Sequence, residues 1–223
     1  MNVLDSELVL GQLRALGYEP VDDYAVADLV LLNTCSVRQH AEDKVYSRLG
    51  EVGHAKQSRP DMVVGVIGCM AERDHEGIRQ RARHVDFLCG PGNLNEIPAL
   101  LEEVADARRR EATDSEYRRD MIVALERDHS RRTPAGRRTL THDSIESLDL
   151  SRTGSCDGPM LQAYVRVQRG CDKFCTYCVV PFTRGPERSR PPAHIIQETQ
   201  KLADLGVKEI TPVSYTHLRA HET

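Results

Sequence analysis

The stretch MVVGVIGC, residues 62–69, has the pattern of a buried β-strand that ends at a cysteine. Its almost continuous apolar run is typical of a strand covered on both faces, as in a parallel sheet. A second run of this kind, ADLVLLNTC at 27–35, also ends at a cysteine. The two runs decide the fold class, because parallel strands need crossover connections and helical patterns flank both of them.

Helical and extended patterns alternate from residue 1 to about residue 104. Apolar residues at helical spacing predict helices over 5–18, 41–56, 71–82 and 94–110. Short β-rich runs predict strands within 27–35, 62–69 and 84–93. We therefore expect an α/β fold with an open, Rossmann-like parallel sheet and helices on both faces.

The middle of the chain interrupts this alternation. Residues 105–159 are rich in charged residues, Ser, Thr, Gly and Pro, which is typical of a linker, with one extended piece at DMIVALE, 120–126. An alternating strand at 160–171, a helix at 192–206 and a strand from residue 207 follow. This order predicts the opening of a second α/β unit over 160–210.

Bulk composition sets only broad limits on function. The 223 residues suffice for one or two compact domains, and a net charge of −4 gives no general attraction to nucleic acid. No run approaches the roughly 18 apolar residues of a membrane span, and the acidic start does not match a secretory signal. Seven cysteines, an odd number, favour metal or catalytic roles in a reducing compartment. We expect a cytoplasmic protein that makes no membrane contact.

Three cysteines are closely spaced in RGCDKFCTYCVVP, residues 169–181, where Cys171, Cys175 and Cys178 form a C-x3-C-x2-C pattern. Structural zinc takes four ligands, usually as two separated pairs, whereas three thiolates on one loop suit a 4Fe-4S cluster with one iron left free. The loop directly follows a predicted strand, which is where α/β barrels place their active sites. A zinc-binding nucleic-acid module remains the alternative, and it would need Cys156 or His194 as a fourth ligand.

The segment GCDKFCTYCVVPFTRGPERSRP, residues 170–191, resembles the radical S-adenosylmethionine (SAM) enzymes, and within them the methylthiotransferases. The segments LLNTCSVRQHAEDKVYSRLG at 31–50 and VVGVIGCMAER at 63–73 are similar to the amino-terminal domain of the same family. The resemblance implies a methylthiotransferase domain over 1–104 and the beginning of a radical SAM partial TIM barrel over 160–210.

The resemblance also implies two cofactors. Cys171, Cys175 and Cys178 would hold a 4Fe-4S cluster whose free iron chelates SAM, and Tyr177 would lie along the adenine of SAM. Arg184 and Glu187, in the same segment, match positions of the family motif.

A second, auxiliary 4Fe-4S cluster is implied for the amino-terminal domain. Cys35 and Cys69 each end a predicted parallel strand, so their thiols face one crevice and are the expected ligands. The family's third ligand lies in a GCQMN-like segment, whereas this chain begins MNVLDSE, so one ligand is missing. Cys89 is the nearby substitute, but the family motif does not use that position, and we expect Cys89 to be structural. Asn33 and Thr34 are expected to cap the helix after Cys35.

Within the family, the loop segment is most similar to the branch that adds a methylthio group to carbon 2 of an isopentenylated adenosine beside the tRNA anticodon. Sister branches act on threonylcarbamoyl-adenosine in tRNA or on a ribosomal protein. The implied partners are the tRNA anticodon loop and an electron donor such as flavodoxin or ferredoxin, and we expect a monomer.

The last residues depart from the family. TPVSYTHLRAHET, 211–223, resembles translated sequencing-adapter sequence, so we expect residues 211–223 to be an artefactual tail whose His217 and His221 bind no metal. Because a complete barrel needs about 200 residues or more, we expect the parent protein to be an enzyme and this exact chain to be inactive.

Overall fold

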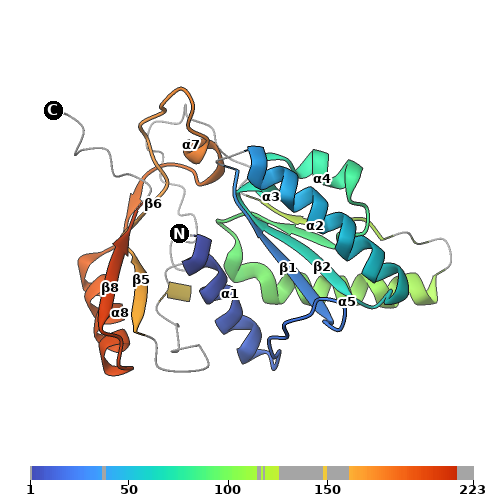
Figure 1. Cartoon of the computed structure of the whole chain (residues 1–223), viewed down its shortest axis with the longest axis horizontal. Helices are drawn as coiled ribbons and strands as arrows, with labels where there is room; N and C mark the ends of the chain where they lie inside the picture. The colour runs from blue at the N-terminus through green and yellow to red at the C-terminus, as the bar shows by residue number, and fades with distance from the viewer. Residues whose placement is uncertain are drawn as a thin grey trace. The chain divides into compact units, whose positions relative to one another are not determined.

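A computed structural model of the chain describes residues 2–36, 39–114, 117, 119–125, 148–149 and 161–214. Contacts divide the chain into two compact units (Figure 1). The sheet unit is Leu13–Glu126, and the loop unit combines Met1–Gln12 with Arg127–Thr223. The domain ranges expected from the sequence remain predictions.

The sheet unit contains four strands in chain order, with each neighbouring pair parallel. The strands are β1 Leu29–Thr34, β2 Val63–Gly68, β3 Phe87–Cys89 and β4 Ile122–Ala124. This arrangement confirms the expected α/β class and open parallel sheet. The extended piece at 120–126, expected in the linker, supplies β4 and pairs with β3.

Helices connect these strands: α2 Gln39–Ser58, α3 Cys69–Arg73, α4 His75–Arg81, the 3-10 turn η1 Leu94–Glu96 and α5 Ile97–Thr113. The single helix predicted over 71–82 is wrong, because Asp74 adopts a φ of −120° and a ψ of 34° and separates α3 from α4. The Tyr46 hydroxyl donates a 2.7 Å hydrogen bond to the Asp74 carboxylate and stabilises this break.

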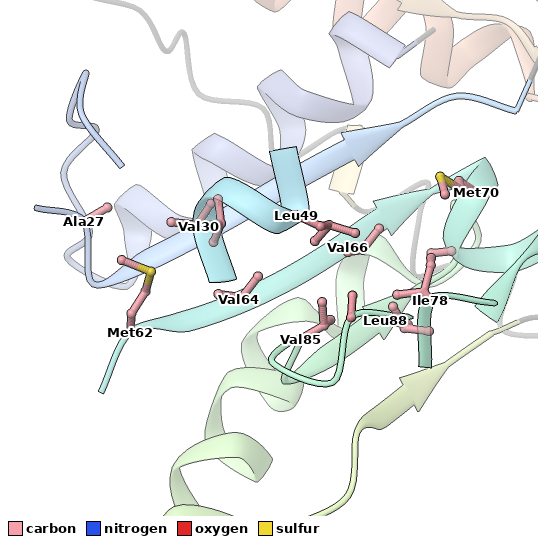
Figure 2. Close-up of a cluster of buried hydrophobic side chains, with 13 residues drawn as sticks. Ala27, Val30, Leu49, Met62, Val64, Val66, Met70, Ile78, Val85 and Leu88 are labelled. Carbon is pink, nitrogen blue, oxygen red and sulfur yellow. The ribbon is translucent and has the colours of Figure 1, made fainter. Parts of the chain in front are cut away.

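The core of the sheet unit lies between one face of the sheet and the helices α2 and α4. Figure 2 shows alternate strand residues, Val64 and Val66, packing in one cluster with Leu49 of α2 and Ile78 of α4. Burying a Val, Leu or Ile side chain contributes about 1.5–3 kcal/mol, so this cluster is a main source of stability. The helix α5 contacts β3 and β4 and runs behind the sheet in the view of Figure 1, so helices cover both faces.

A buried carboxylate holds the amino-terminal ends of these strands. Asp86, directly before β3, has a side chain that is 2% exposed and accepts a 2.7 Å hydrogen bond from the amide of Val64. It forms ion pairs with Lys56, with Arg108 at 3.4 Å and with Arg119 at 3.5 Å. Burial lowers the pKa of Lys56, against the opposing attraction of Asp86. We call these four residues the Asp86 cluster.

The loop unit contains a second parallel pair of strands. Its helices are α7 Val180–Thr183, α8 Pro192–Asp204 and most of α1 Asn2–Ala15, whose last three residues are counted with the sheet unit. Its strands are β5 Gln162–Arg166, β6 Gln168–Arg169, β7 Arg188–Ser189 and β8 Glu209–Val213. β5 and β8 are parallel, and α8 lies between them in the chain, as expected for the start of a barrel. Ala163, Val165, Leu202 and Val207 form the small core of this pair. Residues 211–213, expected in the tail, belong to β8.

No helix in the described ranges combines the length and the apolar character needed to cross a bilayer.

Candidate functional site

Two cysteines lie together at the carboxyl-terminal edge of the sheet. Thr34 of β1 pairs with Gly68 of β2, and Cys35 and Cys69 are the residues that directly follow this pair. Cys35 is half-buried and Cys69 is buried. The structure therefore brings to one edge the two cysteines that the sequence predicted there.

The side chain of Thr34 fixes the turn that carries Cys69. Its hydroxyl donates to the Ile67 carbonyl at 2.7 Å and accepts from the Met70 amide at 3.2 Å. Thr34 thus caps α3, whereas the sequence predicted that it caps the helix after Cys35. Gly68 has a φ of +93°, and a Cβ there would lie 2.6 Å from the Thr34 carbonyl oxygen, so the turn requires glycine.

Cys89 ends β3 but differs chemically from the two edge cysteines. It is fully buried, and its thiol lies 3.5 Å from the Gly90 carbonyl oxygen. Burial, followed by the charges of Glu96 and Glu72, raises the pKa of the Cys89 thiol far above its usual range. Because metals bind the thiolate, this environment favours a structural cysteine.

The cysteine loop, defined here as residues 170–187, is closed at its base by backbone contacts. β6 and β7 pair in antiparallel fashion on its two sides. The amide of Cys171 donates to the Gly185 carbonyl at 3.2 Å. Gly170 has a φ of +69°, and a Cβ there would lie 2.0 Å from the Pro186 carbonyl oxygen, so only glycine fits. Cys171 therefore lies at the point where the loop closes.

The three loop cysteines differ in exposure. Cys171 is buried, whereas Cys175 and Cys178 are half-buried and belong to one turn, in which the Cys178 amide donates to the Cys175 carbonyl at 2.9 Å. Phe174, next to this turn, has a φ of +46°, which is uncommon for a residue other than glycine. In the part of the chain that the structure describes, no three or more His, Cys, Asp or Glu side chains are grouped to hold a metal ion.

Aromatic side chains surround the loop cysteines and face solvent. Tyr177 is 90% exposed, Phe182 is 51% exposed and Phe174 is 41% exposed. Exposed rings of this kind offer flat surfaces on which a nucleobase can stack.

Arg184, which the sequence placed beside the loop, is buried and forms a 2.7 Å ion pair with Asp5 of α1. Glu187, half-buried, accepts a hydrogen bond from Gln168, and its own amide donates to Asp172 at 3.2 Å. Sequence reasoning missed Asp5. An acidic residue in the first turn of a helix is ordinary, so no local signal marks Asp5.

Three residues discussed from the sequence lie outside the described residues: Cys156, His217 and His221. His194 is the third residue of α8, in its first turn, and its amide donates to the Pro191 carbonyl at 3.0 Å.

Comparison with known proteins gives one consistent result. Residues 1–90 match the family described as "Uncharacterized protein family UPF0004". Over 216 residues, 97% of its length, the chain is 44% identical to the tRNA-2-methylthio-N(6)-dimethylallyladenosine synthase of Rhodopirellula baltica. Proteins of the same name from Staphylococcus aureus strains JH9 and Newman are 39% identical over 213 residues, 95% of the chain. The chain spans 42% of the length of the first relative and 36% of the other two.

Proposed function

Because the chain belongs to the methylthiotransferase family that these synthases represent, we propose that it takes part in adding a methylthio group to carbon 2 of an isopentenylated adenosine beside the tRNA anticodon. The observation that carries the proposal is the 44% identity to a synthase of that name, which extends over 97% of the chain. Such a match includes both the sheet edge with Cys35 and Cys69 and the cysteine loop.

The cysteine loop is the proposed site of a 4Fe-4S cluster that binds SAM. Three cysteines on one closed loop supply three of the four thiolates that such a cluster takes, which leaves one iron for a small molecule. The half-buried Cys175 and Cys178 leave the loop accessible, while the buried Cys171 anchors its base. When bound, this cluster supplies the electron for the radical chemistry of SAM.

The protein's own contribution at the loop is positioning. Tyr177, which is 90% exposed and precedes Cys178, is proposed to lie along the adenine of SAM. Phe174 and Phe182 offer further faces for stacking a base of the tRNA substrate. Flavodoxin or ferredoxin is the proposed class of electron donor.

Cys35 and Cys69 are proposed to hold the auxiliary cluster at the sheet edge. Their adjacency in the register of β1 and β2 supports this role, and the hydrogen bonds of Thr34 hold the two turns together. Cys89 is excluded from the proposed ligand set because its burial opposes the thiolate.

Reconstitution with iron and sulfide tests the cluster assignment. The chain, reduced and kept anaerobic, should take up iron and inorganic sulfide in equal amounts and absorb near 400 nm. Cys171→Ser should remove about four irons per chain, because each cubane contains four. The matched control Cys89→Ser should retain them. Bound zinc without colour would instead favour the zinc-binding module, and equal iron in both variants would show that Cys171 is not a ligand.

Nucleoside analysis tests the substrate. In cells that lack methylthiolated adenosine, the chain in its complete reading frame should restore 2-methylthio-isopentenyladenosine in digested tRNA, detected by mass spectrometry. The Cys175→Ser variant should leave only isopentenyladenosine. A methylthio product on threonylcarbamoyl-adenosine or on a ribosomal protein would move the assignment to a sister branch.

A further inference from the structure

A buried group of ion pairs in the loop unit connects α1 with the segments that flank the cysteine loop. We call it the arginine network; its pairs are Arg166 with Asp5 at 3.1 Å and Asp149 at 3.4 Å, Arg184 with Asp5 at 2.7 Å, and Arg190 with Asp149 at 3.7 Å and Glu198 at 2.6 Å. Each of these side chains is at most 8% exposed. Three guanidinium groups therefore face three carboxylates in an interior that excludes water.

Asp5 is the member of the network that reaches both sides of the loop. Its Oδ1 contacts Arg166, the last residue of β5, which precedes Cys171. Its Oδ2 contacts Arg184, which ends α7 and follows Cys178. One buried carboxylate on the first helix thus fixes the entry to the loop and the exit from it.

The exit is linked to Cys171 through consecutive backbone contacts. The amide of Arg184 donates to the Val180 carbonyl at 2.8 Å and closes the short helix α7. The next carbonyl, that of Gly185, accepts from the amide of Cys171. At Gly170 the backbone of Pro186 approaches so closely that no side chain fits. We therefore expect a shift of Arg184 to reach Cys171 through Gly185, the next residue in the chain.

We propose that Asp5 is a positioning residue of the cysteine loop: by holding the guanidinium of Arg184, it keeps Cys171 buried and the base of the loop closed, on which the binding of a cofactor by the loop thiols depends. The identity of that cofactor rests on the proposed function. The closure of the loop does not, because every contact in the argument is present in the chain alone.

A network that only stabilises the fold makes a different prediction from one that positions the loop. Loss of stability alone raises the reactivity of all buried cysteines together, through global unfolding. Loss of positioning raises the reactivity of Cys171 while Cys69 and Cys89 of the sheet unit stay protected. The reactivity of each cysteine in the folded, metal-free chain separates the two.

The test is pulsed alkylation of the reduced, metal-free 223-residue chain with N-ethylmaleimide, with each cysteine quantified by peptide mass spectrometry. Asp5→Asn, which keeps the shape and removes the charge, should speed alkylation of Cys171 by about tenfold or more through local opening. Cys69 and Cys89 should react at the wild-type rate. Asp86→Asn is the matched control: it removes an equally buried carboxylate from the other unit and should leave Cys171 unchanged.

A double-mutant cycle tests whether the faster alkylation of Cys171 results from loss of the ion pair between Asp5 and Arg184. Arg184→Gln should speed Cys171 about as much as Asp5→Asn does, and the double variant should add little further, because each change removes the same contact. Additive effects would overturn the proposal, as would an unchanged Cys171 in a folded Asp5→Asn chain or an equal rise in Asp86→Asn.

Two conservative variants replace Asp5→Asn in the test if that variant fails to fold, as judged by circular dichroism. Asp5→Glu and Arg184→Lys keep both charges and displace the contact, so each should still speed Cys171 selectively. Equal protection of Cys171 in both would overturn the proposal. Iron uptake by the wild-type chain is measured in parallel; its failure counts against the proposed cluster and leaves the alkylation result intact, because alkylation needs no metal.

Discussion

The two units bury charge in different ways. In the Asp86 cluster of the sheet unit one carboxylate faces three cations, and the side chains of Arg108 and Arg119 remain 20% and 24% exposed. Arg119 also pairs with Glu111 at 3.7 Å. In the loop unit three carboxylates face three arginines, none more than 8% exposed. In the Asp86 cluster the arginine side chains can extend toward solvent, and Lys56 can lose its proton. The arginine network has equal numbers of cations and carboxylates and is buried, so its side chains have neither option.

This difference matters because a buried ion pair costs desolvation energy on both sides, and it is strongly destabilising to break only one side. The Asp86 cluster lies at the amino ends of the strands, at the opposite edge of the sheet from Cys35 and Cys69. The arginine network lies beside the cysteine loop. The comparison indicates that buried charge stabilises both units, and that only the arginine network also lies where it can position the cysteine loop.

The largest effect is expected from Arg166→Met. This change leaves Asp5 and Asp149 buried without their shared cation and should lower the free energy of unfolding by about 3–5 kcal/mol. Urea denaturation followed by circular dichroism measures the loss. Arg166→Lys, which keeps a charge at the same position, should lose less. An unchanged midpoint in Arg166→Met would show that the network contributes no net stability.

A smaller loss is expected from Asp86→Asn. The amide oxygen still accepts from Val64, the two arginines reach solvent, and Lys56 already has a lowered pKa and can release its proton. We expect a loss of about 2–3 kcal/mol in the same urea experiment. Asp61→Asn, an exposed carboxylate at the same edge of the sheet, is the control and should change nothing. A loss equal to that of Arg166→Met would remove the contrast between the units.

The sheet unit should also respond to mild acid. Burial, and then the charge of Lys56, lowers the pKa of His84 below its usual 6.5, against the hydrogen bond to Leu49 and the charge of Asp86. Below pH 6.5 the unfolded chain therefore binds a proton that the folded chain does not, so stability falls as the pH drops from 6.5 toward the lowered pKa. Urea midpoints at several pH values between 5 and 8 measure this fall, and His84→Gln should abolish it.

We expect the loop unit, unlike the sheet unit, to be insensitive to mild acid. The side chains that pair in the arginine network are Asp, Glu and Arg, with no histidine among them. Alkylation of Cys171 should therefore keep the same protection factor across that range, once corrected for the intrinsic reactivity of a thiol. Loss of protection at pH 6 would place a titrating group in the network.

The smallest effect is expected at an exposed pair on α5. Arg109 holds the pKa of Asp106 below its usual range, through a hydrogen bond and then its charge, but the two side chains are 75% and 55% exposed. Solvent screens such pairs, so Asp106→Asn should leave the urea midpoint unchanged. A loss comparable to that of Asp86→Asn would mean that burial does not determine how much an ion pair contributes to the stability of this protein.

Local sequence patterns predicted the strands because each strand is a short apolar run between polar turns. They also placed Cys35 and Cys69 at one edge, since parallel strands share their carboxyl ends. The break between α3 and α4 was missed, because Asp74 leaves the helix through a hydrogen bond to Tyr46, which is 28 residues away in the chain. The pattern of residues around Asp74 does not indicate such a long-range contact.

The arginine network was also missed because its ion pairs join residues that are far apart in the chain. The sequence marked Arg184 by its place beside the cysteines, yet nothing in that segment indicates that its partner is on α1. Arg166 even occupies an alternating strand pattern, where an arginine is normally read as exposed. Long-range pairing of charges, rather than any property of the residues alone, determines their role.

The separation between Asp5 and Arg166 is 161 positions along the chain. On a ribosome that adds roughly 5–20 residues per second, Asp5 is therefore made about 8–32 s before its partner exists. Throughout that time the apolar side chains of α1 that become buried, Leu4, Leu8 and Val9, have no completed loop unit to pack against. The helix α1 is thus among the last elements of the loop unit to reach its final contacts, although it is made before the others.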